Sequence, residues 1–226
     1  MKNIVITGTS RGIGLQLALI FAKNNYNVLA ISRKISSELQ TNKNIHNLSL
    51  DISDENSFNK IKKFIEDEWK SSVDIIIHNA GLLINKPFEN LLYADFEKIY
   101  KVNVFAVAKL TQICIPFLQK NAHVVTISSM GGIQGSSKFS GLAAYSSSKG
   151  AVITLSEVLA EEHKEKGISF NVLALGAVNT EMLQEAFPGY IAPVSALEMA
   201  NYIYNFAISG NKYYNGKVLQ VSLSTP

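Results

Sequence analysis

The sequence predicts a single α/β domain over residues 1–226, built on a doubly wound parallel β-sheet with helices on both faces. Short apolar runs alternate with helical patterns along the chain, which is typical of βαβ units. The run from Val73 to Ile77 is nearly all β-branched, as expected of a strand that is buried on both faces. A glycine-rich stretch, Thr7–Gly14, joins the first apolar run to the first helical pattern.

The predicted strands are short runs of mainly apolar residues, and β-branched side chains are frequent in them. Such side chains fit the pleated surface of a sheet. We expect the strands at Lys2–Thr7, Asn27–Ser32, Ile45–Leu50, Val73–Ile77, Ala122–Ser128, Ile168–Leu175 and Lys217–Leu223.

The predicted helices lie between these strands. One apolar helix covers Ile13–Lys23, and residues 54–69 place Phe58, Ile61, Phe64, Ile65 and Trp69 on one face. A long helix is expected from about Asp95 to Leu118, and another carries Tyr145 and Lys149 and ends near Gly167. A capping box, Ser195-Ala-Leu-Glu198, opens a further helix.

Composition excludes several classes of protein. The chain is 47% hydrophobic and 17% charged, which suits a large buried core and excludes general disorder. The net charge is only +3 and the lysines are dispersed, so we expect no nucleic-acid partner.

The chain starts directly with a strand and has no apolar run of about 18 residues, so we expect no signal peptide and no membrane span. The one cysteine, Cys114, excludes an internal disulfide and fits a reducing cytoplasmic location. Because Cys114 lies in an apolar helical segment, we interpret it as a core residue and not as a nucleophile.

The glycine-rich stretch is built to hold phosphate. It reads G-x-x-x-G-x-G and lies at a strand-to-helix junction, where backbone N–H groups and the helix dipole favour an anion. Gly8 permits the tight turn, Gly12 lets phosphate approach the backbone, and Gly14 lets the helix pack closely on the sheet. An ordinary loop with three glycines is the alternative, and the flanking strand and helix argue against it.

A tyrosine and a lysine four residues apart, Tyr145 and Lys149, form a candidate acid/base pair. On a helix this spacing places both side chains on one face. A phenol has a pKa of about 10, so it donates a proton poorly near neutral pH. We expect the Lys149 ammonium to stabilise the phenolate and lower the pKa of Tyr145.

The polar candidates follow the carboxyl ends of the predicted strands, where ligands bind in such sheets. In chain order they are Gly8–Gly14, Ser32 and Arg33, Asp51, Asn79–Gly81, Ser129, and Gly176–Thr180. We therefore expect all of them to lie together at the carboxyl ends of the strands.

Four ordered motifs make the chain resemble a short-chain dehydrogenase/reductase. They are the glycine turn Thr7–Gly14, the Asn-Ala-Gly at Asn79–Gly81, the Ser-Ser-x-x-Gly at Ser128–Gly132, and the Tyr-x-x-x-Lys at Tyr145–Lys149. The resemblance covers essentially the whole chain. It implies a Rossmann-type fold, a nicotinamide cofactor, reversible carbonyl/alcohol interconversion and a homodimer or homotetramer.

The same resemblance implies the site residues. The catalytic set would be Asn103, Ser129, Tyr145 and Lys149. The cofactor would contact Gly8, Ser10, Arg11, Gly12, Ile13, Gly14, Ser32, Arg33, Asp51, Ile52, Asn79, Ala80, Gly81, Tyr145, Lys149, Gly176, Val178 and Thr180.

Two of these roles have structural alternatives. Ser128 and Ser129 could merely finish a strand, but the family pattern matches Ser129 as the group that contacts the substrate carbonyl. Asn103 lies on an apolar helix face with Ile99 and Leu110, so its amide needs buried partners. The resemblance implies a water that links Asn103 to Lys149, and a purely structural asparagine is the alternative.

The chain also departs from the family pattern. His78 stands where the family has an asparagine, and we interpret it as a structural histidine in preference to a catalytic one. The stretch between Ser129 and Tyr145 is long, Leu175-Gly176 replaces Pro-Gly, and the segment 180–195 is short for a lid. The other histidines lack metal-ligand spacing, so we expect no metal site.

Basic residues at the second strand predict the cofactor. NAD-dependent members carry an acidic residue there, whereas this chain has Ser32-Arg33-Lys34 and also Arg11 before Gly12. Two guanidinium groups that converge on one ribose would bind a 2′-phosphate, so we expect NADP(H) in preference to NAD(H). Inconsequential surface arginines are the alternative.

The function predicted from the sequence is a carbonyl reductase, an oxidoreductase that acts on a small-molecule carbonyl or alcohol. Pocket segments expected at 82–89, 136–144 and 182–191 contain no charge cluster, which favours a small apolar or uncharged substrate. The alternative from another class is an NADPH-binding sensor or scaffold that has lost turnover. An epimerase or dehydratase is a third possibility, though these usually have a longer substrate domain.

Overall fold

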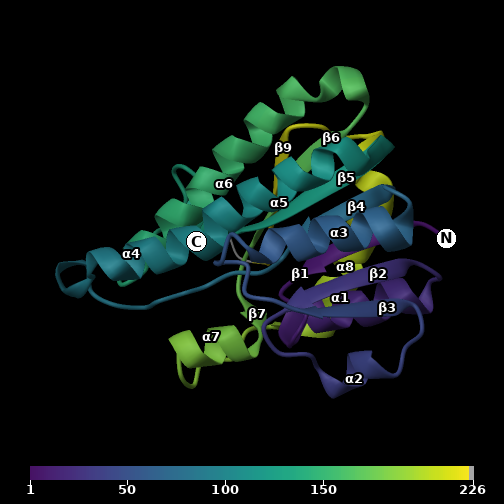
Figure 1. Cartoon of the computed structure of the whole chain (residues 1–226). Coiled ribbons are helices and arrows are strands. Elements are labelled where there is room, and N and C mark those ends of the chain that lie inside the picture. Colours follow the sequence, from purple (N-terminus) through teal and green to yellow (C-terminus); the bar gives the residue numbers. More distant parts are fainter. Residues whose placement is uncertain (224–226) are drawn as a thin grey trace.

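The computed structural model describes residues 1–223 of the chain. Seven strands form one sheet: β1 (Asn3–Thr7), β2 (Asn27–Ser32), β3 (Ile45–Ser49), β4 (Val73–His78), β5 (Leu118–Ser129), β6 (Ser169–Leu175) and β9 (Lys217–Val221). Their order is β3-β2-β1-β4-β5-β6-β9, and every neighbouring pair is parallel. This confirms the predicted doubly wound Rossmann-type α/β fold (Figure 1).

Helices cover both faces of the sheet. The α-helices are α1 (Gly12–Lys23), α2 (Ser37–Gln40), α3 (Ser57–Trp69), α4 (Tyr93–Tyr100), α5 (Ala106–Cys114), α6 (Ala143–Glu162), α7 (Glu181–Ala186) and α8 (Ala196–Ser209). Short 3-10 helices cover Phe88–Asn90, Ile115–Phe117, Met130–Gly132, Lys164–Lys166 and Gly210–Lys212. A small second sheet pairs β7 (Val178–Asn179) with β8 (Val194–Ser195).

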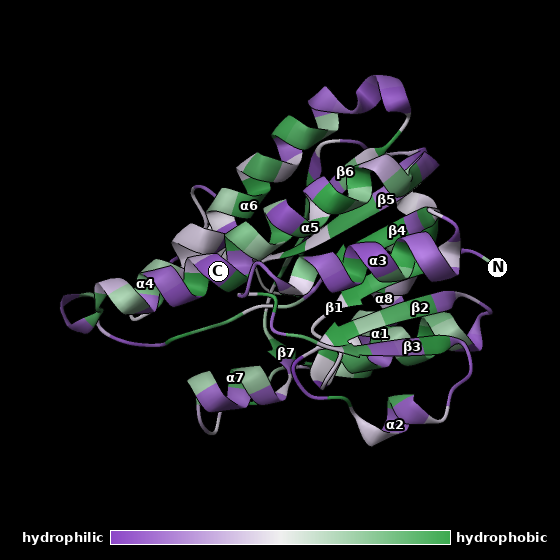
Figure 2. Cartoon of the chain, in the orientation of Figure 1, coloured by the Kyte–Doolittle hydropathy of each residue, from purple (hydrophilic) through white to green (hydrophobic). Residues whose placement is uncertain are grey.

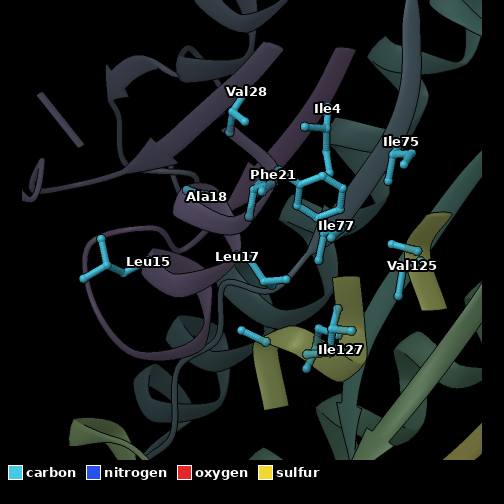
Figure 3. Packing of buried hydrophobic residues seen from close by; sticks show 14 of the residues in the cluster. Ile4, Leu15, Leu17, Ala18, Phe21, Val28, Ile75, Ile77, Val125 and Ile127 are labelled. Carbon is cyan, nitrogen blue, oxygen red and sulfur yellow. The ribbon is translucent and has the colours of Figure 1, made fainter. Parts of the chain in front are cut away.

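Two apolar cores lie on opposite faces of the sheet, because alternate residues of each strand point to opposite sides. In β1, Ile4 and Ile6 face one core and Val5 faces the other. The first core packs α1 and α8 on the sheet, around the fully buried ring of Phe21 (Figure 3). The second packs α3, α5 and part of α6, and it contains Cys114 as predicted. The central strands are accordingly almost uniformly hydrophobic (Figure 2).

The largest departure from the predicted elements concerns the long helix expected at 95–118. It begins at Tyr93, and the carboxylate of Asp95 accepts a hydrogen bond from the Leu92 N–H at 3.0 Å. It widens into a π-helix at Lys101–Phe105 and tightens into a 3-10 turn at Ile115, next to a proline. The short elements α2, α7, β7 and β8 were not predicted, because segments this short carry no periodicity.

The strand order reverses between β1 and β4, which places the first βα turn beside the turn that follows β4. The register aligns the strand ends, since Thr7 pairs with Ile31, His78 with Thr126, and Ser129 with Leu175. The predicted group of polar residues therefore exists. Among the described residues, no helix has both the length and the hydropathy that a bilayer crossing requires.

Candidate active site

The glycine turn has the geometry that its spacing predicts. Gly8 and Gly12 have positive φ angles of 77° and 58°, a region that favours glycine. A Cβ on Gly14 would lie 2.1 Å from the Gly8 carbonyl oxygen, so only glycine fits there. Helix α1 begins without a side-chain cap and without an acidic residue in its first turn. The start of α1 therefore presents backbone N–H groups that its N-cap side chain does not pair, at the positive end of a helix, which fits a pyrophosphate.

Asn79 and Thr7 join this turn to the end of β4. The Asn79 amide donates hydrogen bonds to the carbonyl oxygens of Thr7 and Gly8 at 3.0 and 3.2 Å. The Thr7 hydroxyl oxygen accepts from the backbone N–H groups of Asn79 and Ala80 at 3.2 and 3.1 Å. The conformation of the turn thus depends on a side chain of another loop.

Tyr145 and Lys149 lie on one face at the start of α6, as their spacing predicts. The ammonium Nζ of Lys149 lies 5.8 Å from the centre of the Tyr145 ring, and it donates a hydrogen bond to the Ile127 carbonyl oxygen at 2.8 Å. An ammonium has three N–H donors, and this hydrogen bond uses one of them, which leaves donor capacity for a ligand.

The expected lowering of the Tyr145 pKa by Lys149 is wrong for the protein alone. Burial raises the pKa of the Tyr145 phenol to about 12, and a hydrogen bond with Ser129 offsets only part of this effect. Burial also lowers the pKa of Lys149 to about 8. Desolvation therefore outweighs the attraction between the two groups, and Tyr145 is a neutral phenol at pH 7.

The two adjacent serines have different partners. Ser128 is buried, and its hydroxyl donates to the Lys149 carbonyl oxygen at 2.8 Å, which ties β5 to α6. The Ser129 oxygen accepts from the Gly131 N–H at 3.2 Å and also shares a hydrogen bond with Tyr145. Ser129, the serine predicted to contact the substrate, is therefore the one whose hydroxyl lies beside the Tyr145 phenol.

Asn103 lies within the π-helix, a form that occurs often at functional sites. Its amide oxygen accepts from the Leu82 N–H at 2.7 Å, and its amide nitrogen donates to the Leu82 carbonyl and the Ser148 hydroxyl at 3.0 and 2.9 Å. The amide thus has direct protein partners, and the water that the resemblance implies between Asn103 and Lys149 stays a prediction. A Cβ on Gly81 would lie 3.5 Å from Lys149 Nζ and 3.7 Å from Asn103 Oδ1, so these groups adjoin.

His78 is the structural histidine that we expected. Its Nε2 lies 2.9 Å from the Thr111 hydroxyl, and burial lowers its pKa to about 3. A neutral, enclosed ring with a satisfied nitrogen is the environment expected of a structural histidine.

The basic residues near the second strand do not converge as expected. Arg11 forms a bidentate ion pair with Glu185 of α7, and one of its two hydrogen bonds, from Nη2 to Oε2, measures 2.8 Å. The charge of Arg33 acts on Asp51: burial, the largest effect, raises the pKa of Asp51, but hydrogen bonds from Ser53 and this charge bring it below its usual value. The Ser32 hydroxyl donates to the Lys34 carbonyl oxygen at 2.7 Å.

The segment after β6 reaches back to the glycine turn. Gly176 follows β6, Val178 is buried in β7, and the Thr180 oxygen caps α7 by accepting from the Leu183 N–H at 3.3 Å. A Cβ on Gly12 would lie 3.5 Å from the Thr180 side chain. An open cavity of about 610 Å³ lies between this segment, α1 and α2.

The three segments predicted to line the substrate pocket meet. The Asn85 amide donates to the Ala186 carbonyl oxygen at 2.9 Å, and the Lys86 N–H donates to the Gly141 carbonyl oxygen at 2.9 Å. Sequence reasoning missed Asn85, and it also missed Glu185 and Ser148. Ser148 could have been predicted, because it precedes Lys149 in the same motif. The contacts of Asn85 and Glu185 have no local signal in the sequence.

Comparison with known proteins agrees with this geometry. The family described as short chain dehydrogenase matches residues 2–190. A 3-amino-tetrahydro-pyrrolizinone reductase of Xenorhabdus hominickii is 32% identical over 79% of this chain, which spans 62% of that relative's length. An NADPH-dependent pterin aldehyde reductase of Arabidopsis thaliana is 31% identical, over 93% of this chain and 90% of the relative.

A solved structure of ElxO with NADP bound is 30% identical and superposes with a TM-score of 0.84, over 98% of this chain and 97% of the other. The family match covers more than half of the chain and includes the glycine turn, Asn103, Ser129, Tyr145 and Lys149. The chain therefore belongs to the short-chain dehydrogenase family.

Proposed function

We propose that this protein is an NADP(H)-dependent carbonyl reductase, which interconverts a carbonyl compound and the corresponding alcohol. The observation that carries the proposal is the shared site of Tyr145, Ser129, Lys149 and Asn103 beside the glycine turn. The names of the relatives agree with it, since one is an NADPH-dependent aldehyde reductase and the ElxO structure holds NADP.

The residues at the strand ends fit a dinucleotide. The glycine turn and the uncapped start of α1 would hold the pyrophosphate, and Lys149 the nicotinamide ribose. Arg33, and Arg11 once it leaves Glu185, would bind a 2′-phosphate. The remaining contacts would come from Ser10, Ile13, Ser32, Asp51, Ile52, Asn79, Ala80, Gly81, Gly176, Val178 and Thr180.

In this mechanism the bound cofactor supplies the hydride, and the protein handles the proton. The Ser129 hydroxyl orients the substrate carbonyl and donates a hydrogen bond to its oxygen, where negative charge develops. The Tyr145 phenol, which burial keeps protonated, gives its proton to the same oxygen. With a pKa of about 8, Lys149 is mainly an ammonium at pH 7, and its charge stabilises the phenolate that remains. Asn103 positions the Leu82 backbone and Ser148 beside this pair.

Titration calorimetry with NADPH and NADH tests the choice of cofactor. We expect NADPH to bind at least about tenfold more tightly, a difference of about 1.4 kcal/mol, because the 2′-phosphate gains charge-assisted hydrogen bonds. Equal dissociation constants for the two cofactors would remove the NADP(H) part of the proposal.

The Tyr145→Phe variant separates the enzyme from the alternative of a sensor. It removes one hydroxyl and little volume, so the fold and the NADPH dissociation constant should hardly change. If Tyr145 is the general acid, kcat for reduction of a carbonyl substrate should fall by roughly 10²-fold or more. The substrate panel should include aldehydes and ketones, and cofactor absorbance gives the rate. Tight NADPH binding without turnover by the wild type across the panel would favour the sensor.

A further inference from the structure

The fork of Arg11 that is assigned to a 2′-phosphate already has a partner within the chain. Both terminal nitrogens of its guanidinium donate to the two carboxylate oxygens of Glu185, which lies 174 positions away at the end of α7. Their hydrogen bonding, ahead of other effects, raises the pKa of Arg11 and lowers that of Glu185, so both are charged near neutral pH. A carboxylate and a phosphate engage a guanidinium in the same two-pronged way.

Glu185 is not the only negative charge at this place. The cavity between α1, α2 and α7 is also lined by Glu38 and Glu181, and the charge of Glu181 acts on Arg11 as well. Helix α7 is short, and the Asn85 amide donates a hydrogen bond to the carbonyl oxygen of Ala186, its last residue. The helix therefore holds Glu185 against Arg11, the glycine-turn residue that directly precedes α1.

From this geometry we infer that Glu185 is a specificity-determining residue, which competes with the 2′-phosphate of NADP(H) for Arg11. The inference rests on the proposed use of NADP(H). A phosphate that binds the Arg11 fork must displace the Glu185 carboxylate, and two anions that share one guanidinium also repel each other. NAD(H) lacks the 2′-phosphate, so it can bind without displacing Glu185. Glu185 thus narrows the advantage of NADP(H) over NAD(H).

The size of the effect follows from exposure. The side chains of Arg11 and Glu185 are 46% and 63% exposed, so water and salt screen their attraction. Exposed ion pairs of this kind are weak, and a loss on that scale corresponds to about a threefold change in a binding constant. The competition therefore tunes the affinity and does not abolish it.

Titration calorimetry with adenosine 2′,5′-bisphosphate and with 5′-AMP isolates the 2′-phosphate and needs no turnover. Glu185→Gln should bind the bisphosphate about threefold more tightly than the wild type and bind 5′-AMP equally well. Glu38→Gln is the matched control, since it removes the same charge from the same cavity without touching Arg11, and it should change the affinity for the bisphosphate less. In an Arg11→Ala background, Glu185→Gln should have no effect on either ligand.

The outcomes separate this inference from the cofactor proposal. If the wild type prefers the bisphosphate and Arg11→Ala abolishes that preference, but Glu185→Gln leaves it unchanged or weakens it, the competition is refuted and the use of NADP(H) stands. An equal gain in Glu38→Gln also refutes it, because the cause is then the general charge of the cavity. If the wild type shows no preference for the bisphosphate, the cofactor proposal itself fails.

Discussion

Replacing Asn103 with alanine tests how the π-helix supports the site. The change removes three hydrogen bonds, two with the Leu82 backbone and one with Ser148. At about 1 kcal/mol net for each bond, the free energy of unfolding should fall by about 3 kcal/mol. Urea denaturation followed by circular dichroism measures this loss. Because Gly81 lies between Leu82 and the Lys149 ammonium, kcat for carbonyl reduction should fall as well.

Ser148→Ala is the control for Asn103→Ala, because it leaves the Leu82 backbone paired. It removes one of the three hydrogen bonds, together with the bond from the Ser148 hydroxyl to the Tyr145 carbonyl oxygen at 2.6 Å. At about 1 kcal/mol for each of these two bonds, it should cost about 2 kcal/mol of unfolding free energy, less than the loss in Asn103→Ala. If Asn103→Ala loses activity but keeps the stability of the wild type, the positioning argument is wrong, and Asn103 acts on the reaction without supporting the fold.

Two further predictions concern single hydroxyls and buried imidazoles. Ser129→Ala should lower kcat/KM by about two orders of magnitude, and Ser128→Ala far less, since the Ser128 hydroxyl donates to the α6 backbone. Steady-state kinetics measures both losses, and the reverse order would mean that Ser128, and not Ser129, donates to the substrate oxygen. Burial lowers the pKa values of His78 and His123 to about 3 and about 4, below the ordinary 6.5, so stability is complete above pH 6.5 and falls as the pH drops toward 4. At pH 5 each histidine should cost about 2 kcal/mol, and equal urea midpoints at pH 7.5 and pH 5 would contradict this.

The sequence was sufficient to predict the sheet, because buried parallel strands carry a strong local signal. The strand predicted at Asn27–Ser32 matches β2 to the residue, and the β-branched run from Val73 became the central strand β4. The helix predicted through Lys101–Phe105 was wrong in its interior, since one π-helical turn of five residues within an α-helix is too short to change the apolar pattern recognisably. The bonding of Asn103 to the Leu82 backbone, 21 positions away, likewise has no local signal in the sequence.

The candidate site divides in the same way. The glycine turn, Ser129 and the Tyr145–Lys149 pair follow from local spacing, and the structure brings them to one edge. The ion pair between Arg11 and Glu185 depends on how α7 folds back, which no local pattern records. The direction of the Tyr145 pKa shift was also mistaken, because burial cannot be read from a four-residue spacing.

The direction of β1 and β9, the first and last strands in sequence, has a practical consequence for handling the protein. Strand β1 starts at the end of the sheet's strands that lies away from the site. Strand β9, which is parallel to β1 through β4, β5 and β6, ends beside Gly176 (Figure 1). A Cβ on Gly176 would lie 2.3 Å from the Ser222 hydroxyl oxygen, so the chain that leaves β9 passes directly over the end of β6. A purification tag or surface linker fused ahead of β1 would therefore lie at the opposite end of the strands from the site, whereas Ser222, which follows β9, lies at the same end as the site.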